Sequence, residues 1–188
     1  MASYKNPSIS INSRSLANCK NIMLVENKAN TEYQWGETEL ILTNNRMKLI
    51  ALAINFRTVP NYMNIGSNEL AGSWNDTKKS QLIESFLINF PVMPVIIYES
   101  LRQSIEVIDG KQRIRTIVEF YSNQLVLRDL KIKSDLNGCT YATLPSQVKR
   151  TLNRHSLSLI SVTPSGDASP EEIEKLMKTL ANRLKLDK

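Results

Sequence analysis

The chain has 188 residues, of which 41% are hydrophobic, and it carries a formal net charge of +6. This length supports one ordinary hydrophobic core, and the sequence contains neither a secretory signal nor a run close to the roughly 18 consecutive apolar residues of a membrane span. The modest positive charge favours anionic partners, namely nucleic acid, nucleotides or phosphorylated surfaces.

The first part of the chain predicts an N-terminal arm followed by helices. The arm covers residues 1–36, is most polar through Asn30, and has a short strand at 22–25. Apolar residues between 37 and 56 predict one or two helices, which Asn44-Asn45 could break. Thr58-Val59-Pro60 predicts a short extended piece, because the residue before proline avoids the helical region.

The middle of the chain predicts a helix, a hairpin and a second helix. Helical spacing predicts an amphipathic helix over 77–89, with Asn75 or Asp76 as its N-cap and Pro91 as its stop. β-branched runs predict strands over 95–98 and 105–108, joined by a polar turn at 100–103. The next helix is expected over 112–121, followed by a short strand at 125–127.

The last part of the chain predicts a helix, a strand and a terminal amphipathic helix. Residues 145–153 predict a helix with proline in its first turn, and residues 157–162 predict a strand. After a loop at 164–169, Ser169-Pro170-Glu171-Glu172 has the pattern of an N-cap with a capping box. The whole predicts an α+β fold with one domain over 37–163 and a C-terminal amphipathic helix over 164–188.

The junction at Asp109 is the most informative part of the sequence. An apolar strand ends at Ile108, Asp109-Gly110 makes a tight turn, and a basic helix follows at once. Free N–H groups and the helix dipole at such a start suit a phosphate, which Lys111, Gln112 and Arg113 would help to bind while Gly110 admits it. Asp109 could hold Mg²⁺, orient a water, or pair with Arg113. In the alternative interpretation, Asp109 caps the helix and Arg113 pairs with a carboxylate.

Other candidate groups are weaker. Lys78-Lys79 lie in the first turn of a helix, where cations are mildly unfavourable and an anionic ligand would explain them, but the sequence favours two solvated lysines. Trp74 is more often a core residue than a base-stacking platform. The two cysteines, Cys19 and Cys139, predict reduced thiols and a cytoplasmic location. With His155 as its one histidine, the chain lacks the ligands of a zinc site or an HNH nuclease.

Several ordered motifs resemble the N-terminal domain of GmrSD-type restriction endonucleases. The resemblance extends from about Thr58 to Val162, and its motifs are Trp74 with Ser80-Gln81-Leu82-Ile83-Glu84-Ser85, then Val107-Ile108-Asp109-Gly110-Lys111-Gln112-Arg113, then Leu136-Asn137-Gly138 with Leu144-Pro145. It implies a ParB/sulfiredoxin-like fold in which the strand-turn-helix junction binds nucleotide phosphates. It also implies NTP hydrolysis with Mg²⁺, coupled to cleavage of modified phage DNA by a separate HNH domain.

This sequence departs from the family pattern at two positions. Lys111 replaces the first glutamine of the DGQQR motif, and the upstream IPxYQR motif corresponds to Val59-Pro60-Asn61-Tyr62-Met63-Asn64, so its arginine is absent. An HNH domain is also missing from this chain, which would then be a fragment, the partner of a separate nuclease subunit, or a stand-alone regulator.

Three functions follow as hypotheses. The leading one is an Mg²⁺-dependent NTPase in restriction and anti-phage defence, with Asp109 and Arg113 as catalytic residues, Asp109 as the metal ligand, and residues 110–113 binding the nucleotide. The second is a DNA-binding or regulatory module with a degenerate nucleotide site. The third is an interaction domain whose terminal helix docks a partner or forms a homodimer.

Overall fold

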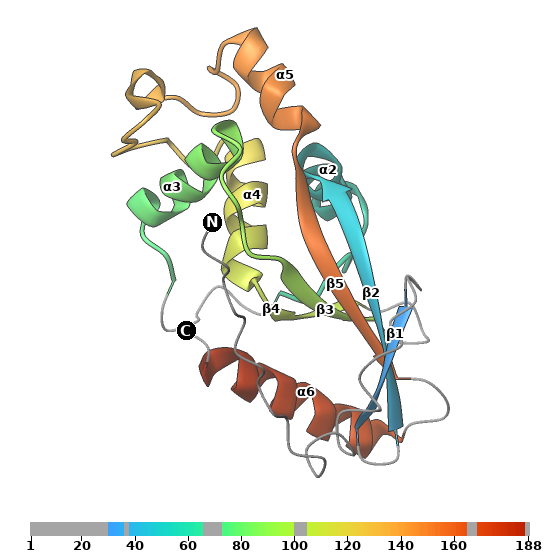
Figure 1. Cartoon of the computed structure of the whole chain (residues 1–188). Coiled ribbons are helices and arrows are strands. Elements are labelled where there is room, and N and C mark those ends of the chain that lie inside the picture. Colours follow the sequence, from blue (N-terminus) through green and yellow to red (C-terminus); the bar gives the residue numbers. More distant parts are fainter. Residues whose placement is uncertain (1–29, 36–37, 66–72, 100–104, 165–168, 187–188) are drawn as a thin grey trace, which may run out of the picture.

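A five-stranded mixed sheet forms the centre of the fold (Figure 1). The computed structural model describes residues 30–35, 38–65, 73–99, 105–164 and 169–186. The strands are β1 (Asn30–Trp35), β2 (Thr38–Lys48), β3 (Val95–Glu99), β4 (Ile105–Asp109) and β5 (Ser156–Pro164), in the order β1-β2-β5-β3-β4. The pair β3/β5 is parallel and the other neighbours are antiparallel. The predicted α+β class is confirmed, whereas the ParB/sulfiredoxin-like assignment stays a prediction.

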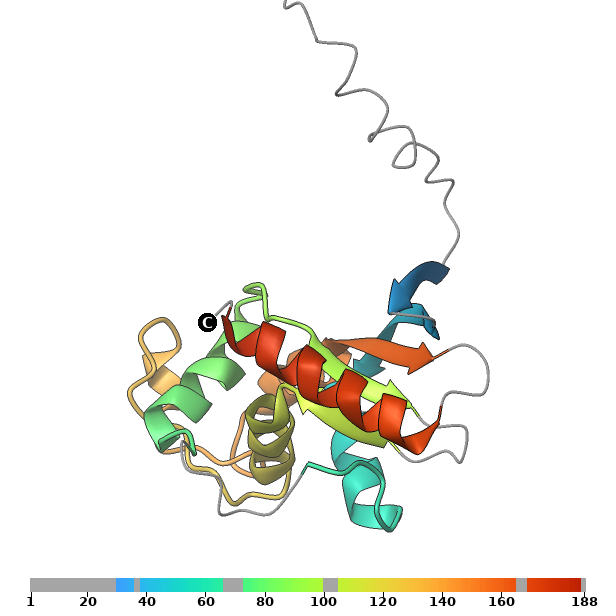
Figure 2. The same cartoon turned by 90° about the horizontal axis from the view of Figure 1, so that it is seen from below.

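Helices cover both faces of the sheet. They are α2 (Leu49–Thr58), α3 (Asp76–Leu87), α4 (Lys111–Tyr121), the 3-10 turn η1 (Ser134–Leu136), α5 (Ser146–Arg154) and α6 (Pro170–Leu186). In Figure 2 the helix α6 crosses one face of the strands while α3 and α4 lie on the other side. None of the helices in the described ranges is both long enough and apolar enough to cross a membrane.

The alternation of side chains along β5 explains why both faces are covered. Leu157 and Leu159 are buried in the main core with α2, α3, α4 and α5. Val162 points to the opposite face, where it packs with Leu40 and Leu176 of α6. Because successive strand residues point to opposite faces, one short apolar run supplies both cores.

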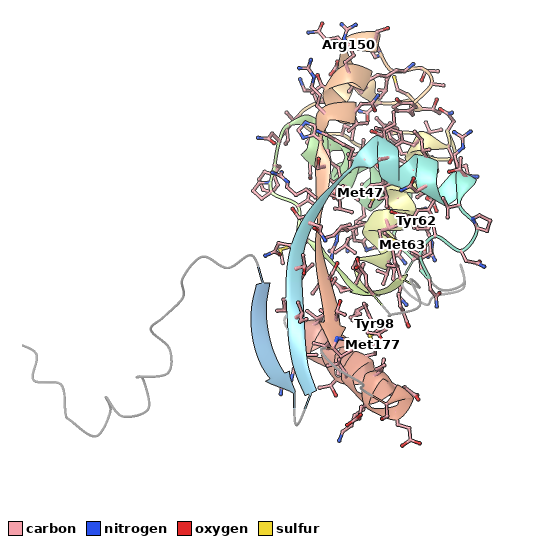
Figure 3. The ribbon with its side chains drawn as sticks, turned by 90° about the vertical axis from the view of Figure 1, so that its right-hand side faces the viewer. Met47, Tyr62, Met63, Tyr98, Arg150 and Met177 are labelled. Atoms are coloured by element: carbon pink, nitrogen blue, oxygen red, sulfur yellow. The ribbon has the colours of Figure 1, made fainter. Side chains whose placement is uncertain are left out.

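The terminal helix α6 packs on the sheet as an amphipathic element of this chain. Its start is the predicted capping box, since the Glu172 amide donates to Ser169 Oγ at 3.3 Å and the Ser169 amide donates to Glu172 Oε2 at 2.8 Å. Leu176 is only 2% exposed. Figure 3 labels Tyr98 of β3 and Met177 of α6 at the place where the helix meets the sheet.

The helix and hairpin predicted in the middle of the chain are confirmed. Helix α3 begins at Asp76, with Asn75 as the N-cap, whose side chain accepts a hydrogen bond from the Lys78 amide at 2.8 Å. Strands β3 and β4 pair as antiparallel neighbours, as the sequence predicts. The helix expected over 112–121 is α4, and the one expected over 145–153 is α5.

The prediction of helices between 37 and 56 is wrong for its first half. Residues Thr38–Lys48 form β2, and a helix, α2, begins only at Leu49. Asn44 and Asn45 lie inside the strand rather than breaking a helix. They pair with Ile160 and Leu159 of β5 in a ladder that extends from Leu40 to Lys48. The hydrogen bonds of this long pairing outweigh the local helix propensity of residues 38–48, because the stability of a strand depends strongly on its neighbours. Strand β1 lies inside the range that the sequence assigned to the arm.

The strand predicted at 125–127 is absent, although its burial pattern is present. Leu125 and Leu127 are buried, whereas Val126 is 39% exposed. The Leu127 amide donates to the Cys139 carbonyl at 2.9 Å, and the Gly138 amide donates to Leu127 at 2.7 Å, so this loop pairs locally with another loop. The extended piece at 58–60 is reduced to Val59, because Thr58 ends α2. The strand at 22–25, the turn at 100–103 and Cys19 lie outside the described residues.

Candidate functional site

The junction between β4 and α4 has the geometry that the sequence predicts. Strand β4 ends at Asp109, Gly110 adopts a left-handed conformation with φ of 93°, and α4 begins at Lys111. No side chain of the described residues caps this helix start. The first-turn amides of α4 therefore point to the junction together with the positive end of the helix dipole. Ile114 and Ile117, both fully buried, fix the helix against the core.

Gly110 is required by close packing within the protein. A β-carbon at this position would lie 2.6 Å from Cγ2 of Val95 and 3.0 Å from Nη2 of Arg113. The left-handed φ adds a second reason, because residues with a β-carbon rarely adopt it. The close approach that this glycine permits is that of the Arg113 guanidinium, whereas the sequence led us to expect the approach of a ligand.

Asp109 and Arg113 form an ion pair across the turn. Nη2 of Arg113 donates to Oδ2 of Asp109 at 2.7 Å and to the Pro94 carbonyl at 3.1 Å. Both side chains are mostly buried, with 11% and 19% of the Arg113 and Asp109 side chains exposed. This pairing confirms the part of the alternative interpretation in which Arg113 pairs with a carboxylate, whereas Asp109 does not cap the helix. The ion pair fixes the guanidinium in one orientation beside the helix start.

A pocket opens at this junction, and we call it the junction pocket. Its volume is about 180 Å³, and it is lined by Trp74, Ile108, Asp109, Gly110, Lys111, Gln112 and Arg113. All five residues that the sequence singled out therefore lie around one pocket. Trp74 also packs partly against the main core, and Nζ of Lys78 lies 4.8 Å from the centre of its ring.

Among the described residues, two buried polar atoms of pocket residues have no hydrogen-bond partner. They are Oε1 of Gln112, an acceptor, and Nε of Arg113, a donor. Buried polar atoms are nearly always satisfied, so such atoms beside a pocket indicate a ligand or ordered water. The Lys111 ammonium adds a cation that has no ion pair within the part of the chain that the structure describes.

The two lysines at the start of α3 behave differently. Nζ of Lys79 forms an ion pair of 2.7 Å with Glu119 of α4, and 14% of its side chain is exposed. Lys79 is thus a structural link between two helices. Lys78 lies on Trp74 at the edge of the junction pocket and is the one of the two cations that can reach a ligand there.

The donor set at the junction fits a magnesium ion that arrives with a nucleotide. In the described residues no three His, Cys, Asp or Glu side chains come together as a metal site. Asp109 is the acidic side chain among the lining residues. Mg²⁺ is usually held by one or two carboxylates together with substrate phosphates and waters, so a single carboxylate is compatible with it.

Residues 59–64, the predicted counterpart of an IPxYQR motif, lie beside β4 at Asn64. The Asn64 amide donates to the Ile105 carbonyl at 2.8 Å, and the Val107 amide donates to the Asn64 carbonyl at 3.1 Å. Met63 is 5% exposed and belongs to the main core, while Tyr62 donates to Sδ of Met47 at 3.3 Å (Figure 3). Asn64 therefore pairs with β4 at Glu106, three residues before Asp109.

Glu84 is a buried residue of the α3 motif whose role the sequence did not indicate. Its carboxylate accepts hydrogen bonds from the amides of Ile132 at 2.7 Å, Lys133 at 2.8 Å and Lys131 at 3.4 Å. Burial raises the pKa of Glu84, but these three amides lower it, and the net pKa lies below its usual value of 4.5. Glu84 thus holds the loop before η1 and does not face the junction pocket.

A second, larger pocket brings together residues that are far apart in the sequence and were not predicted to meet. It has a volume of about 440 Å³, and its cationic lining residues are Arg46, Lys48 and Arg154, with His155 beside them. We call it the basic pocket. Residues 48 and 154 are 106 positions apart, so only the pairing of β2 with β5 brings them together.

Comparison with known proteins finds a family model that matches the part of the chain containing the junction. The model of the family "GmrSD restriction endonuclease, N-terminal domain" matches residues 72–185, more than half of the 188-residue chain. This range contains α3, the β3–β4 hairpin, α4 and most of α6. No curated protein and no solved structure matches the chain. The match confirms the resemblance seen in the motifs.

Proposed function

Because the chain belongs to the GmrSD restriction endonuclease N-terminal domain family, we propose that it binds a nucleoside triphosphate at the junction pocket and hydrolyses it with Mg²⁺. Membership gives the chain a role related to restriction. In the proposal, nucleotide turnover controls a nuclease that is carried on a separate subunit or domain.

The observation that carries the proposal is the set of unsatisfied polar groups around one small pocket. The uncapped first turn of α4 offers N–H donors, and the buried Nε of Arg113 offers another. Lys111 supplies a point charge. Backbone donors, a guanidinium and an ammonium around one helix start suit a polyphosphate.

The size of the pocket limits which part of the nucleotide it can enclose. Drug-sized and cofactor-sized ligands usually occupy roughly 300–1,000 Å³, whereas the junction pocket has about 180 Å³. It therefore suits the phosphates, with the nucleoside at the mouth. There Trp74 offers an aromatic surface.

Each residue at the junction then has a distinct role. Arg113 and Lys111 bind the phosphates, and the ion pair with Asp109 keeps the guanidinium in place. Asp109 would hold Mg²⁺ together with the phosphates, and the ion would supply charge neutralisation when bound. Gly110 allows the turn that sets these groups around one point.

A regulatory module that binds a nucleotide without hydrolysing it is the second candidate function. It is favoured by Asn64, which stands where the family's arginine is expected, and by Lys111 in place of glutamine. Both candidates share the junction pocket, so binding and turnover must be measured separately.

The test is isothermal titration of ATP, GTP and CTP with Mg²⁺ into the wild-type chain, followed by phosphate release on the same samples. We expect Lys111→Ala to weaken binding about tenfold and Arg113→Ala to abolish it, because charged hydrogen bonds to phosphate are lost. Lys175→Ala is the matched control, since Lys175 is an exposed lysine of α6.

Three outcomes decide between the candidates. Binding with turnover supports the NTPase, and binding without turnover supports the regulatory module. No binding by wild type, or equal weakening by Lys111→Ala and Lys175→Ala, would overturn both. Thermal unfolding of each variant separates loss of the site from loss of the fold, which matters most for Arg113→Ala because Asp109 would lose its partner.

A further inference from the structure

We propose that the basic pocket binds an unpaired nucleotide of a nucleic-acid strand, with the backbone phosphate on Arg46 and Arg154 and the base against Phe90. The proposal goes beyond the nucleotide site, because it concerns a different pocket and a polymeric ligand. It stands or falls independently of NTP binding at the junction.

The charged residues that line the basic pocket are all positive. Its cationic residues are Arg46 and Lys48 at the end of β2 and Arg154 at the end of α5, and none of the described lining residues is acidic. In the part of the chain that the structure describes, the side chain of Arg46 makes no hydrogen bond or ion pair. Concave surfaces lined by one sign of charge concentrate counterions, here phosphates.

Of the three cations in the basic pocket, Lys48 has a structural role within the described residues. Nζ of Lys48 donates to the Arg154 carbonyl at 2.5 Å, so it satisfies a carbonyl at the end of α5. Arg46 and Arg154 are exposed, and within the described residues their guanidinium groups satisfy no backbone carbonyl. They are free to form two-pronged hydrogen bonds with a phosphate.

His155 adds a neutral polar group to the lining. Burial lowers its pKa, and the charge of Lys48 lowers it further. Its ring lies 6.5 Å from the ring of Phe86, which lines the same pocket. At neutral pH the imidazole therefore offers hydrogen bonds rather than a further charge.

Phe90 is the feature that favours a nucleic-acid strand over a free anion. Its side chain lines the basic pocket and is 63% exposed, although a phenylalanine is usually buried. The Phe90 amide donates to the Ser85 carbonyl at 2.8 Å, and Asn89 before it has a positive φ of 56°, so the backbone here is held in a defined turn. An exposed aromatic ring beside cations is the arrangement with which proteins bind single strands.

The two pockets are separated by the length of α3. Trp74, which lines the junction pocket, precedes this helix, whereas Asn89 and Phe90, which line the basic pocket, follow it. A helix of 12 residues spans about 18 Å. One nucleoside triphosphate cannot occupy both sites, so variants in one pocket can be tested without touching the other.

The experiment is fluorescence anisotropy of the full chain with a labelled oligothymidylate of about 15 nucleotides and with an abasic strand of equal length. We expect Arg46→Gln/Arg154→Gln to weaken binding of both strands at least tenfold. The slope of log affinity against log salt should fall by about 1.4 for two lost phosphate contacts on a single strand. We expect Phe90→Ala to weaken the oligothymidylate about tenfold and to leave the abasic strand unchanged.

The matched control is Arg57→Gln/Arg150→Gln, which removes two exposed arginines that do not line the pocket. Arg150 lies at the outer end of the molecule on α5 (Figure 3). Equal weakening in the control and in Arg46→Gln/Arg154→Gln, no binding by wild type, or tighter binding of duplex with no effect of Phe90→Ala would each overturn the proposal. Titration of Mg²⁺-ATP into Arg46→Gln/Arg154→Gln should match wild type, which keeps this test separate from the junction site.

Discussion

The guanidinium of Arg113 lies where a side chain on Gly110 would have to stand. A β-carbon on Gly110 would be 3.0 Å from Nη2 and 3.2 Å from Nε of Arg113. The same Nη2 joins Asp109 to the Pro94 carbonyl. The glycine, the carboxylate and the guanidinium are therefore one structural unit, and a change in any of them acts on the other two.

Gly110→Ala should lower the free energy of unfolding by about 3 kcal/mol, because it combines a left-handed residue with overpacking against Val95. Gly138→Ala is the control, since Gly138 has a φ of 85° but no atom within 4 Å of the added carbon. Gly138→Ala should lower the free energy of unfolding by only about 1–2 kcal/mol, which is the cost of a left-handed backbone at a residue with a β-carbon. Chemical denaturation measures both. Equal losses would mean that the contact with Val95 relaxes without cost.

Asp109→Asn should separate binding from turnover at the junction pocket. Asparagine keeps an oxygen that can accept the hydrogen bond from Arg113, and the change removes a negative charge beside the phosphates. NTP affinity measured without Mg²⁺ should therefore be retained or rise up to about tenfold. Turnover with Mg²⁺ should fall at least about 100-fold, because the Mg²⁺ ligand or water-orienting group is lost. Titration without Mg²⁺ and phosphate release with Mg²⁺ measure the two effects. Weaker binding without Mg²⁺ in a variant with wild-type thermal stability would contradict these roles.

Asn64→Arg should raise the rate of NTP hydrolysis without tightening binding. Residue 64 pairs with Glu106 in β4, three positions before Asp109, which corresponds to about 10 Å along the strand. A long arginine side chain there can approach the phosphates, as the family motif implies. Steady-state phosphate release compares the variant with Asn64→Gln, which lacks the charge. Equal rates in the two variants would show that a cation at 64 does not act on the junction.

Glu84→Gln should destabilise the chain by about 2 kcal/mol at neutral pH, since a buried carboxylate that accepts backbone hydrogen bonds loses its charge. The pKa of Glu84 is lowered in the folded state. Its contribution is therefore fully present above the ordinary value of 4.5 and is lost as the pH falls through the folded-state pKa. The difference between wild type and Glu84→Gln should shrink below pH 4.5 in denaturation curves. The exposed Glu171→Gln should show no such difference at neutral pH.

The junction was predictable because its determinants are consecutive in the sequence. A strand, a turn glycine and a basic helix start follow one another from Val107 to Arg113, and local rules describe each of them. The sequence offered the pairing of Arg113 with Asp109 as one of several alternatives and did not decide between them. That contact depends on the Pro94 carbonyl and on Val95, which the pairing of β3 with β4 brings to the turn.

Strand β2 and the basic pocket were not predictable for the opposite reason. The apolar residues of 38–48 fit a helix as well as a strand, and the choice is made by β5, more than a hundred residues later in the chain. Arg46 and Arg154 meet only through that pairing. At 125–127 the alternation correctly predicts burial of Leu125 and Leu127, but a ladder needs a partner strand, and here the partner is the loop at Cys139.

The pairing of β2 with β5 also decides how this protein can be divided. The family match begins at residue 72, after β1, β2 and α2, yet β2 pairs with β5 at nine consecutive positions. A fragment cut at the start of the match would leave the long edge of β5 bare and would expose Leu157 and Leu159, which pack with α2 in the main core. Such an edge recruits other strands. The segment before the match thus covers the edge of β5 and protects the protein from self-association. Expression of the matched region alone should therefore yield aggregates.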